Sequence, residues 1–381
     1  MNDDAAKEQQ AMSIHVTTPL LLRRDTAPLR LVQPCEGLVT IPLPPRVKDF
    51  PELRYMGSKH RLLPWIHSVL ATLDFETAAD PFVGSGAVSY LLKAMGKRVI
   101  ASDFLNFPAT LATATIENSR LHLDGPVLKK ILAPVKNAPD FIERTFSGVF
   151  YSRPDLRFLD RISHTIEKLE HPHHRALARA ALFRSCLKKQ PRGVFTFVGN
   201  RYDDGRRDLR LSIEEHFLEQ VEAFNAIVFD NGRRHTVRRA DVFDLKPRGV
   251  DLVYLDPPYV PRSDDNCYVK RYHFLEGLSC YWRGLEIMKE TKVKKITKPY
   301  TPFSYRRTAI EAFERLFHKY RNSIIVLSYS SNGFPNKEEL ERMLRQHKKN
   351  VLTFEKPHRY HFGTHAAVKR AEVNEYLIVG R

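Results

Sequence analysis

Cysteine is scarce in this sequence. The 381-residue chain contains four cysteines, Cys35, Cys186, Cys267 and Cys280, and no two of them are close enough for a zinc ribbon or a redox motif. We therefore expect reduced thiols. A histidine cluster at 171–174 has no acidic or cysteine partner at ligand spacing, so we predict a surface turn between helices there and no metal site.

Long hydrophobic runs and a leader sequence are also missing. No stretch is apolar for long enough to cross a bilayer. The N-terminus, MNDDAAKEQQ, is acidic and polar, whereas a signal peptide begins with basic residues followed by apolar ones. We therefore expect a cytoplasmic protein that does not enter a membrane.

Acidic residues are also few relative to basic ones. The chain has 44 Asp and Glu against 61 Lys and Arg, which gives a net charge of +17. A hydrophobic fraction of 43% and a charged fraction of 28% are ordinary for a globular protein, so the excess charge is the unusual feature. Such a chain attracts polyanions, and nucleic acid is the first candidate partner. A basic enzyme without a nucleic-acid substrate is the alternative.

The chain divides into stretches that differ in the periodicity of their apolar residues. Residues 1–48 show no sustained periodicity and end in a proline-rich segment, so we predict an N-terminal tail that is either flexible or draped over the domain. Strands and helices alternate over 49–110 and again over 236–381, which predicts an α/β fold built around a parallel sheet. The stretch 111–235 lacks this alternation and is mostly helical in pattern, so we interpret it as an insertion.

The alternation can be followed element by element. Residues 75–96 predict a strand, a tight glycine turn and a helix. Further helices are predicted at 61–73, 308–320 and 337–349. Further strands are predicted at 97–104, 235–245 with its turn, 250–260 with its loop, 323–331, 351–360 and 373–380, the last two as an antiparallel pair.

The most informative motif is Asp256-Pro257-Pro258-Tyr259, which closes an apolar strand. Proline cannot continue a strand ladder, and each proline holds the residue before it extended. The result is a stiff loop at the carboxyl end of a strand, where open α/β sheets bind ligands. A strand-ending turn with an incidental aspartate is the alternative.

The groups of this loop suit an adenine amine, whose lone pair is delocalised into the ring. The Asp256 carboxylate and the Pro257 carbonyl can accept both amine hydrogens and turn the lone pair toward an incoming methyl group. Tyr259 can stack on the base, which has to be flipped out of a duplex first. Direct transfer needs proximity and alignment more than a general base, so we expect neither a catalytic cysteine nor a metal.

A second motif follows the first strand of the alternating region. Its glycines let the backbone approach a ligand, and the helix N-terminus adds a favourable dipole. Asp103 stands about twenty residues later, where a carboxylate accepts hydrogen bonds from ribose hydroxyls. A simple tight turn is the alternative. The candidate residues of the turn are Asp80, Phe82, Val83, Gly84 and Gly86.

The motifs together resemble the DNA adenine methylase (Dam-like) family of adenine-specific DNA methyltransferases. The resemblance is carried, in chain order, by RYMGSKHRLLPWI, DPFVGSGAVSYLL, SDFLN, ADVFDL and VYLDPPY. This is the alpha motif order, in which the insertion is the target-recognition domain. The resemblance implies a Rossmann-like S-adenosylmethionine-dependent methyltransferase sheet with helices on both faces and a mostly helical inserted recognition domain.

The resemblance also implies roles for individual residues. Tyr55 and Lys59 would hold the methionine end of S-adenosylmethionine, and Asp103 would bind its ribose. Asp241 and Phe243 would contact its adenine. Phe82, Val83, Gly84 and Gly86 would form the floor beneath it, and Asp256, Pro257, Pro258 and Tyr259 would hold the target adenine.

The chain departs from the family pattern in places. Asp80 stands where the family often has Glu, and Gly57-Ser58 stands where it often has Gly-Gly. Both changes are mild. The insertion does not closely match the family's best-known tetranucleotide recognition segment, which leaves the target sequence open but not the reaction.

Two groups of basic residues are candidates for phosphate contacts, with a solvated surface as the alternative for each. They are Arg201, Arg206 and Arg207 in the insertion, and Lys292, Lys294 and Lys295 after the catalytic loop. Four residues that follow this loop could clamp the flipped base or fill its vacated space. They are Tyr268, Arg271, Tyr272 and His273.

The sequence therefore predicts methyl transfer to the N6 amine of a flipped-out adenine in duplex DNA. We expect a monomeric restriction-modification methylase whose cognate endonuclease acts separately. An RNA adenine methyltransferase, a cytosine-N4 methyltransferase and a catalytically silent DNA-binding module are the alternatives. A Rossmann oxidoreductase is disfavoured, because the glycine turn lacks the third glycine of the dinucleotide motif.

Overall fold

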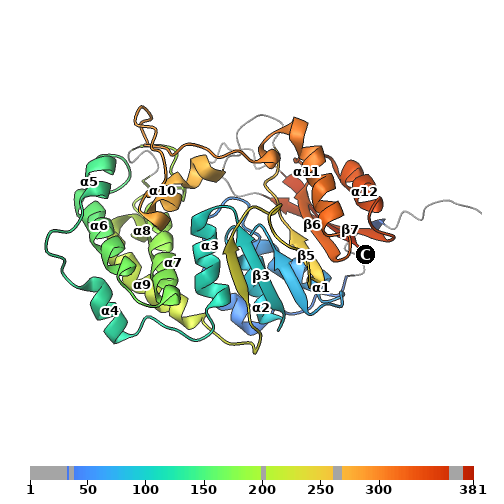
Figure 1. Ribbon diagram of the computed structural model, residues 1–381, viewed down its shortest axis with the longest axis horizontal. Coiled ribbons are helices and arrows are strands. Elements are labelled where there is room, and N and C mark those ends of the chain that lie inside the picture. The colour runs from blue at the N-terminus through green and yellow to red at the C-terminus, as the bar shows by residue number, and fades with distance from the viewer. Residues whose placement is uncertain (1–31, 34–37, 199–202, 261–267, 360–371) are drawn as a thin grey trace, which may run out of the picture. The chain divides into compact units, whose positions relative to one another are not determined.

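The sheet is the central element of the fold (Figure 1). The structure, a computed structural model, describes residues 32–33, 38–198, 203–260, 268–359 and 372–381. Its strands lie in the order β1-β7-β8-β6-β5-β2-β3-β4. Their bounds are β1 Val32–Gln33, β2 Thr77–Asp80, β3 Arg98–Asp103, β4 Thr236–Arg239, β5 Leu252–Leu255, β6 Ile324–Ser330, β7 Val351–Arg359 and β8 Glu372–Gly380.

Most of the sheet is parallel. Strands β2 to β6 run in one direction, whereas β8 is antiparallel to both β6 and β7, which confirms the antiparallel pair predicted at the end of the chain. Strand β2 pairs with β3 on one side and with β5 on the other, so the chain order reverses at β2. Open α/β sheets bind their ligands at such a switch point.

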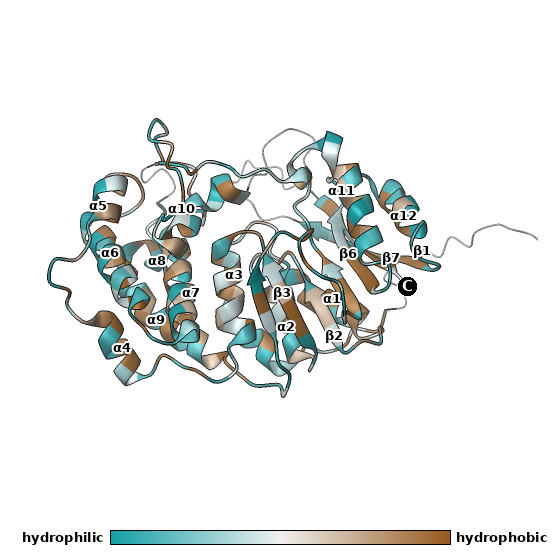
Figure 2. Cartoon of the chain, viewed as in Figure 1, coloured by the Kyte–Doolittle hydropathy of each residue, from teal (hydrophilic) through white to brown (hydrophobic). Residues whose placement is uncertain are grey.

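Helices cover both faces of the sheet, as predicted. Side chains alternate along β5: Leu252 and Tyr254 join the core cluster that contains α1 (Leu63–Leu70) and α2 (Ala87–Ala94). Val253 and Leu255 join the cluster that contains α11 (Arg306–Lys319) and α12 (Lys337–Arg345). This is the period-two alternation of a strand that is buried on both sides. Figure 2 shows the matching pattern, with hydrophobic strands and helices that carry both colours.

The stretch from 111 to 235 is mostly helical, as the pattern predicted. Helix α3 continues directly into η3 across residue 111, and α3 contacts both β3 and α7, so the core is continuous there. Helix α10 (Tyr268–Cys280), which follows the catalytic loop, also packs on α3 and α7. The remaining bounds are α3 Asn106–Ala112, η3 Thr113–Glu117, α4 Gly125–Leu132, α5 Phe141–Phe146, α6 Arg153–Glu167, α7 Pro172–Lys189, α8 Arg207–Arg210 and α9 Ile213–Ala226.

The described part of the predicted tail contacts the folded body. Strand β1 pairs in parallel with β7. The backbone N–H of Ile41 donates to Ser68 Oγ at 3.0 Å, and Val47, in the short helix η1 (Pro45–Asp49), is 1% exposed. Residues 1–31 lie outside the described residues.

The surface turn between helices predicted at the histidine cluster is confirmed for His171, which is exposed between α6 and α7, and wrong for His173 and His174. His171 is the N-cap of α7, and His173 and His174 lie in its first turn, because Pro172 suits the first helical position. The described residues contain no group of three or more His, Cys, Asp or Glu placed to hold a metal ion. Cys186 and Cys280 are free thiols, and the other two cysteines lie outside the description.

Within the same described ranges, no helix has both the length and the apolar character needed to span a membrane.

Candidate active site

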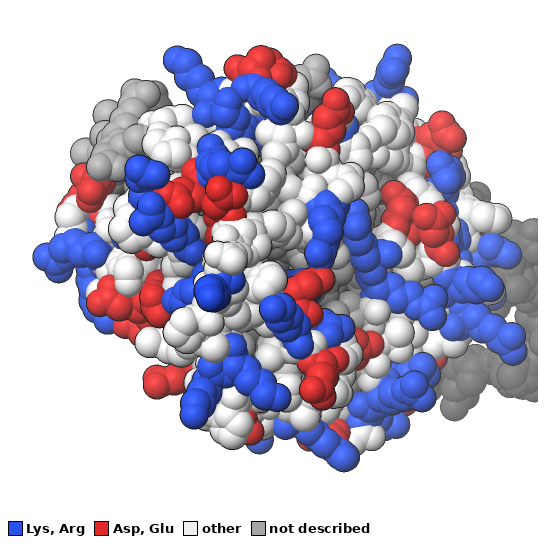
Figure 3. All heavy atoms as spheres, turned by 60° about the vertical axis from the view of Figure 1, so that its left-hand side comes forward, with Lys and Arg blue, Asp and Glu red and all other residues white. Residues whose placement is uncertain are grey.

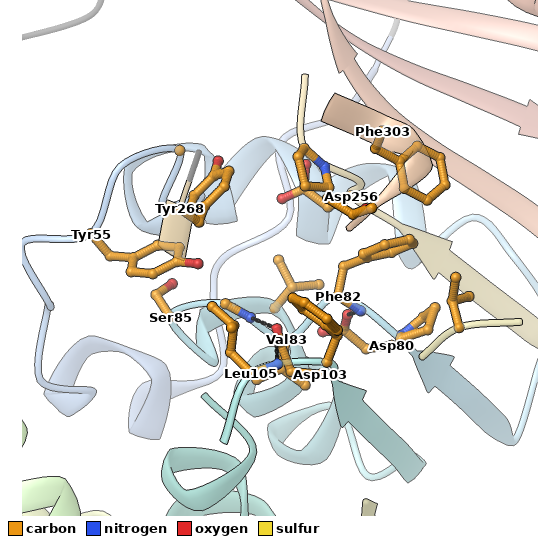
Figure 4. A pocket seen from close by; sticks show the side chains of 18 of the residues that line it. Tyr55, Asp80, Phe82, Val83, Ser85, Asp103, Leu105, Asp256, Tyr268 and Phe303 are labelled. Carbon is orange, nitrogen blue, oxygen red and sulfur yellow. Dashed lines mark hydrogen bonds between the residues drawn. The ribbon is translucent and has the colours of Figure 1, made fainter. Parts of the chain in front are cut away.

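A cavity of about 1060 Å³, its open mouth included, lies at the carboxyl ends of β2, β3, β4 and β5 (Figure 4). It brings together segments that are far apart in sequence, from Tyr55 to Ser304, at the switch point where open α/β sheets bind their ligands. Most of the predicted site residues line it: Tyr55, Lys59, Asp80, Phe82, Val83, Gly84, Asp103, Asp241, Asp256 and Pro258. Gly86, Phe243, Pro257 and Tyr259 lie outside the lining.

The glycine turn after β2 is built as predicted. Gly84 and Gly86 have φ angles of +52° and +79°, which L-residues with side chains rarely adopt, and Gly86 is the N-cap of α2. A Cβ atom on Gly84 would lie 3.1 Å from the ring of Tyr55. The glycine therefore lets Tyr55 lie directly against the turn, so that ring and backbone border the cavity together.

Asp103, at the end of β3, is anchored to this turn. Its carboxylate accepts hydrogen bonds from Gly84 N at 3.0 Å and from Leu105 N at 2.9 Å, as the dashed lines in Figure 4 show. Burial raises the pKa of Asp103 to about 7, and the two backbone hydrogen bonds oppose that rise. The carboxylate can accept further hydrogen bonds from a ligand hydroxyl, since each carboxylate oxygen can accept two.

Aromatic rings form the wall beside Asp241. Phe82 meets Phe303 edge to face with ring centroids 5.6 Å apart, and Phe303 stacks on Phe243 at 6.2 Å. Phe243 therefore supports the wall from behind, and Phe303 forms its surface. The sequence argument missed Phe303, because it belongs to no motif. Other lining residues that it missed include Ser58, Ser85, Leu105 and Lys298.

The catalytic loop and the lysine of the YMGSK motif meet in an ion pair. Lys59 Nζ lies 2.8 Å from Asp256 Oδ2 and donates to the Gly57 carbonyl at 3.1 Å, while its own side chain is 5% exposed. Burial raises the pKa of Asp256, and the charge of Lys59 opposes that rise. The negative charge of Glu375 raises it further.

Tyr259 is not among the residues that line the cavity. Its hydroxyl donates to Glu375 Oε2 at 3.0 Å, and its ring meets Tyr329 edge to face at 4.9 Å. Lys59 Nζ lies 5.0 Å from the centroid of the same ring. The stacking role of Tyr259 against a target base therefore stays a prediction.

Of the four residues proposed as a clamp, Arg271 is half-buried and does not line the cavity. Tyr268 lines the cavity and stacks on Tyr55, with centroids 5.5 Å apart. Tyr272 is 1% exposed and its hydroxyl accepts the Met56 N–H at 2.6 Å, while a ring nitrogen of His273 lies 2.8 Å from the Phe195 carbonyl. The clamp is wrong for Tyr272 and His273, because both are buried against helix and loop backbone.

The candidate phosphate contacts differ in availability. Arg207 pairs with Glu219, and Arg206 with Asp204. Lys292 is exposed, whereas Lys294 donates to the Lys289 carbonyl at 2.6 Å and Lys295 is half-buried. Arg201 lies outside the described residues. Figure 3 shows Lys and Arg spread over the face that carries the helical region, interleaved with acidic side chains.

Asp80 provides a prediction on stability. Its carboxylate is 2% exposed and accepts from Ser89 Oγ at 2.7 Å and from Phe82 N at 3.2 Å, yet burial raises its pKa to about 7. Above its ordinary pKa the unfolded chain ionises more readily than the folded one, so the folded state loses stability as pH rises toward 7. Asparagine fills the same space without that loss.

We expect Asp80→Asn to gain about 2–3 kcal/mol in unfolding free energy relative to the parent between about pH 5 and pH 8. Thermal or urea unfolding at both pH values measures it. Asp74→Asn, at an exposed position before β2, is the matched control and should show no such trend. A gain that does not vary with pH would contradict the account of Asp80.

Fold and cavity together are those of an α/β methyltransferase, in which a glycine turn and a strand-end carboxylate share one site with an Asp-Pro-Pro-Tyr loop. A family model of D12 class N6 adenine-specific DNA methyltransferases matches residues 55–342, and the chain belongs to this family. It is an adenine-specific DNA methyltransferase, and the family implies a methyl donor and DNA as substrate.

Curated relatives agree with this assignment. The chain is 32% identical over 328 residues to the type II methyltransferase M2.HphI of Haemophilus parahaemolyticus, covering 82% of this chain and 92% of that protein. It is 29% identical over 349 residues to the type II methyltransferase M.FokI of Planomicrobium okeanokoites, covering 85% of this chain and 52% of that protein. It is 24% identical over 329 residues to the modification methylase StsI of Streptococcus sanguinis, covering 77% of this chain and 46% of that protein. The chain spans about half the length of the latter two.

Proposed function

We propose that the methyl donor is S-adenosylmethionine and that it binds in the cavity at the β2–β5 switch point. The residues that line the cavity match the chemical groups of this cofactor. Asp103 has lone pairs for ribose hydroxyls, the wall of Phe82 and Phe303 suits a flat adenine ring, and Asp241 can accept from the adenine amine. The ammonium of Lys59 is placed to attract a carboxylate. When bound, this cofactor supplies an electrophilic methyl group on a positively charged sulfur.

The observation that carries the proposal is that Asp256 opens into the same cavity as Asp103 and Phe82. A base held by Asp256 therefore lies beside the proposed donor site, which is the proximity that direct transfer requires. The Asp256 carboxylate and the Pro257 carbonyl accept the two amine hydrogens, which localises the lone pair on nitrogen. Pro258 and Tyr268 border this end of the cavity and keep water from it.

The substrate follows from the position of the site. An adenine inside a duplex cannot reach a carboxylate at the end of a buried strand, so the target base is flipped out. The helical region at 111–235 is the proposed target-recognition domain, and its basic residues contact phosphates together with Lys292. The type II names of the relatives support a restriction-modification methylase. We propose that it acts as a cytoplasmic monomer beside a separate endonuclease.

Transfer of tritiated methyl groups from S-adenosylmethionine to three nucleic acids tests this proposal. Mixed-sequence duplex DNA, the same DNA as single strands, and RNA are each incubated with the purified full chain. We expect label mainly in the duplex. Label mainly in RNA would move the substrate to the alternative RNA methyltransferase, and no label despite bound donor would favour the silent DNA-binding module.

A further inference from the structure

A basic hairpin follows α10 and leads directly to the cavity. Residues 285–297 fold back on themselves, with an antiparallel bridge between Ile287 and Ile296 and a hydrogen bond from Met288 N to the Lys295 carbonyl at 2.7 Å. The buried side chains of Val293 and Ile296, at 5% and 4% exposure, anchor the hairpin. Its tip, between Met288 and Val293, is exposed. In Figure 1 this hairpin projects, in orange, beside α10.

The strap after the hairpin borders the cavity on one side and solvent on the other. Lys298, Pro299, Thr301, Phe303 and Ser304 line the cavity, whereas Tyr300, between them, does not. Tyr300 is 62% exposed. The strap therefore places one exposed tyrosine ring beside residues that line the cavity.

Tyr300 does not stand alone. Its ring stacks on that of Tyr305, with centroids 5.9 Å apart and planes inclined by 13°. Lys298 Nζ lies 5.1 Å from the centroid of the Tyr305 ring, a cation–π distance. Tyr305 is itself 37% exposed, so the described structure holds two parallel rings and one cation at the surface. We call these three residues the tyrosine platform.

Exposed aromatic rings of this kind indicate a binding surface. The large hydrophobic side chains that are exposed in the described residues are few, and Met288, Tyr300 and Tyr305 all belong to the hairpin and strap. Stacked rings beside lysines are the pattern that proteins use to bind the faces of unpaired bases, because every base offers a π face and every phosphate a negative charge. Charge complementarity on a chain of net charge +17 points the same way.

We propose that the tyrosine platform stacks on the base that is left unpaired in the duplex when the target adenine enters the cavity. The proposal rests on the flipped-out adenine of the proposed function. Asp256 and the strap line the same cavity, so a duplex whose adenine is held by Asp256 lies close to the strap. The partner base then loses its pair, and the exposed ring of Tyr300 replaces part of the lost stacking.

Binding of matched duplexes tests the platform. Two fluorescent duplexes carry the methylation site mapped with the parent protein, one with thymine opposite the target adenine and one with an abasic position there. Dissociation constants are measured for the parent, Tyr300→Ala and Tyr300→Phe. Leu218→Ala, another exposed large hydrophobic residue, is the control outside the hairpin and strap.

We expect Tyr300→Ala to weaken binding of the thymine duplex about tenfold, as loss of one base–aromatic stack does. The loss should shrink to under about twofold on the abasic duplex, because the stacking partner is already gone. Tyr300→Phe and Leu218→Ala should bind both duplexes like the parent. Binding of S-adenosylmethionine by every variant shows that the fold is intact.

An equal loss on both duplexes, or no loss on either, would overturn the platform. These results differ from failure of the proposed function, in which the parent protein itself would methylate no duplex. A parent that methylates the duplex while Tyr300→Ala binds it normally would refute the platform alone.

Discussion

Asp256→Ala is expected to lower the rate of methyl transfer by about 1000-fold, as removal of one preorganised contact to the reacting group does at other active sites. The Asp256 carboxylate is one of two acceptors available for the adenine amine, and the other is a backbone carbonyl that the substitution keeps. Binding of S-adenosylmethionine should stay near the parental level, because Asp256 is not among the proposed contacts of the donor. Single-turnover rates and donor dissociation constants measure the two effects separately.

Asp74→Ala is the control for this substitution, since it removes an exposed carboxylate at the opposite end of the parallel strands. It should methylate DNA at the parental rate. If Asp256→Ala retained more than about a tenth of the parental rate, the adenine amine would have to be held by other groups.

Lys59→Met is expected to have two effects that have one cause, the loss of a buried positive charge between the donor site and Asp256. Donor binding should weaken by about 10- to 100-fold, the range for a charge-assisted hydrogen bond. The acidic limb of the rate profile should also move to higher pH. Asp256 accepts the amine hydrogens only when ionised, so activity falls as pH drops through its raised pKa, and Lys59 holds that pKa down.

Glu375→Gln is the matched variant with the opposite sign. Glu375 raises the pKa of Asp256, so its neutral replacement should move the acidic limb to lower pH. The glutamine oxygen can still accept the Tyr259 hydroxyl proton, which preserves that contact. Rates of methyl transfer at saturating S-adenosylmethionine, measured across the acidic pH range, test both variants. If the acidic limbs of Lys59→Met and Glu375→Gln moved in the same direction, the charge argument would be contradicted.

Local periodicity was enough to predict most elements of the sheet domain. The helix predicted at 308–320 is α11 at Arg306–Lys319, and the strand predicted at 97–104 is β3 at Arg98–Asp103. Both segments combine a clear apolar period with turn residues at their ends, so neighbouring residues alone decide their structure. The turn predicted at the histidine cluster ends earlier than expected, because Pro172 begins a helix there and proline suits the first helical position.

The cavity was predicted from motifs and completed only by tertiary structure. Asp80, Asp103 and Asp256 follow strands, and parallel strands bring their carboxyl ends to one edge, so their convergence could be expected. Phe303 carries no signal, because its place in the wall depends on how the strap after the hairpin crosses the site. The orientation of Tyr259 depends on Tyr329 and Glu375, which lie on strands far along the chain. The individual roles of the site residues stay predictions.

The identity of the methylated nucleoside tests the central claim most directly. Duplex DNA is incubated with the full chain and S-adenosylmethionine, digested to nucleosides and analysed by mass spectrometry. The proposed roles of the Asp256 carboxylate and the Pro257 carbonyl predict N6-methyl-2′-deoxyadenosine as the product. Methyl groups found on cytosine instead would contradict the claim that this loop holds an adenine amine.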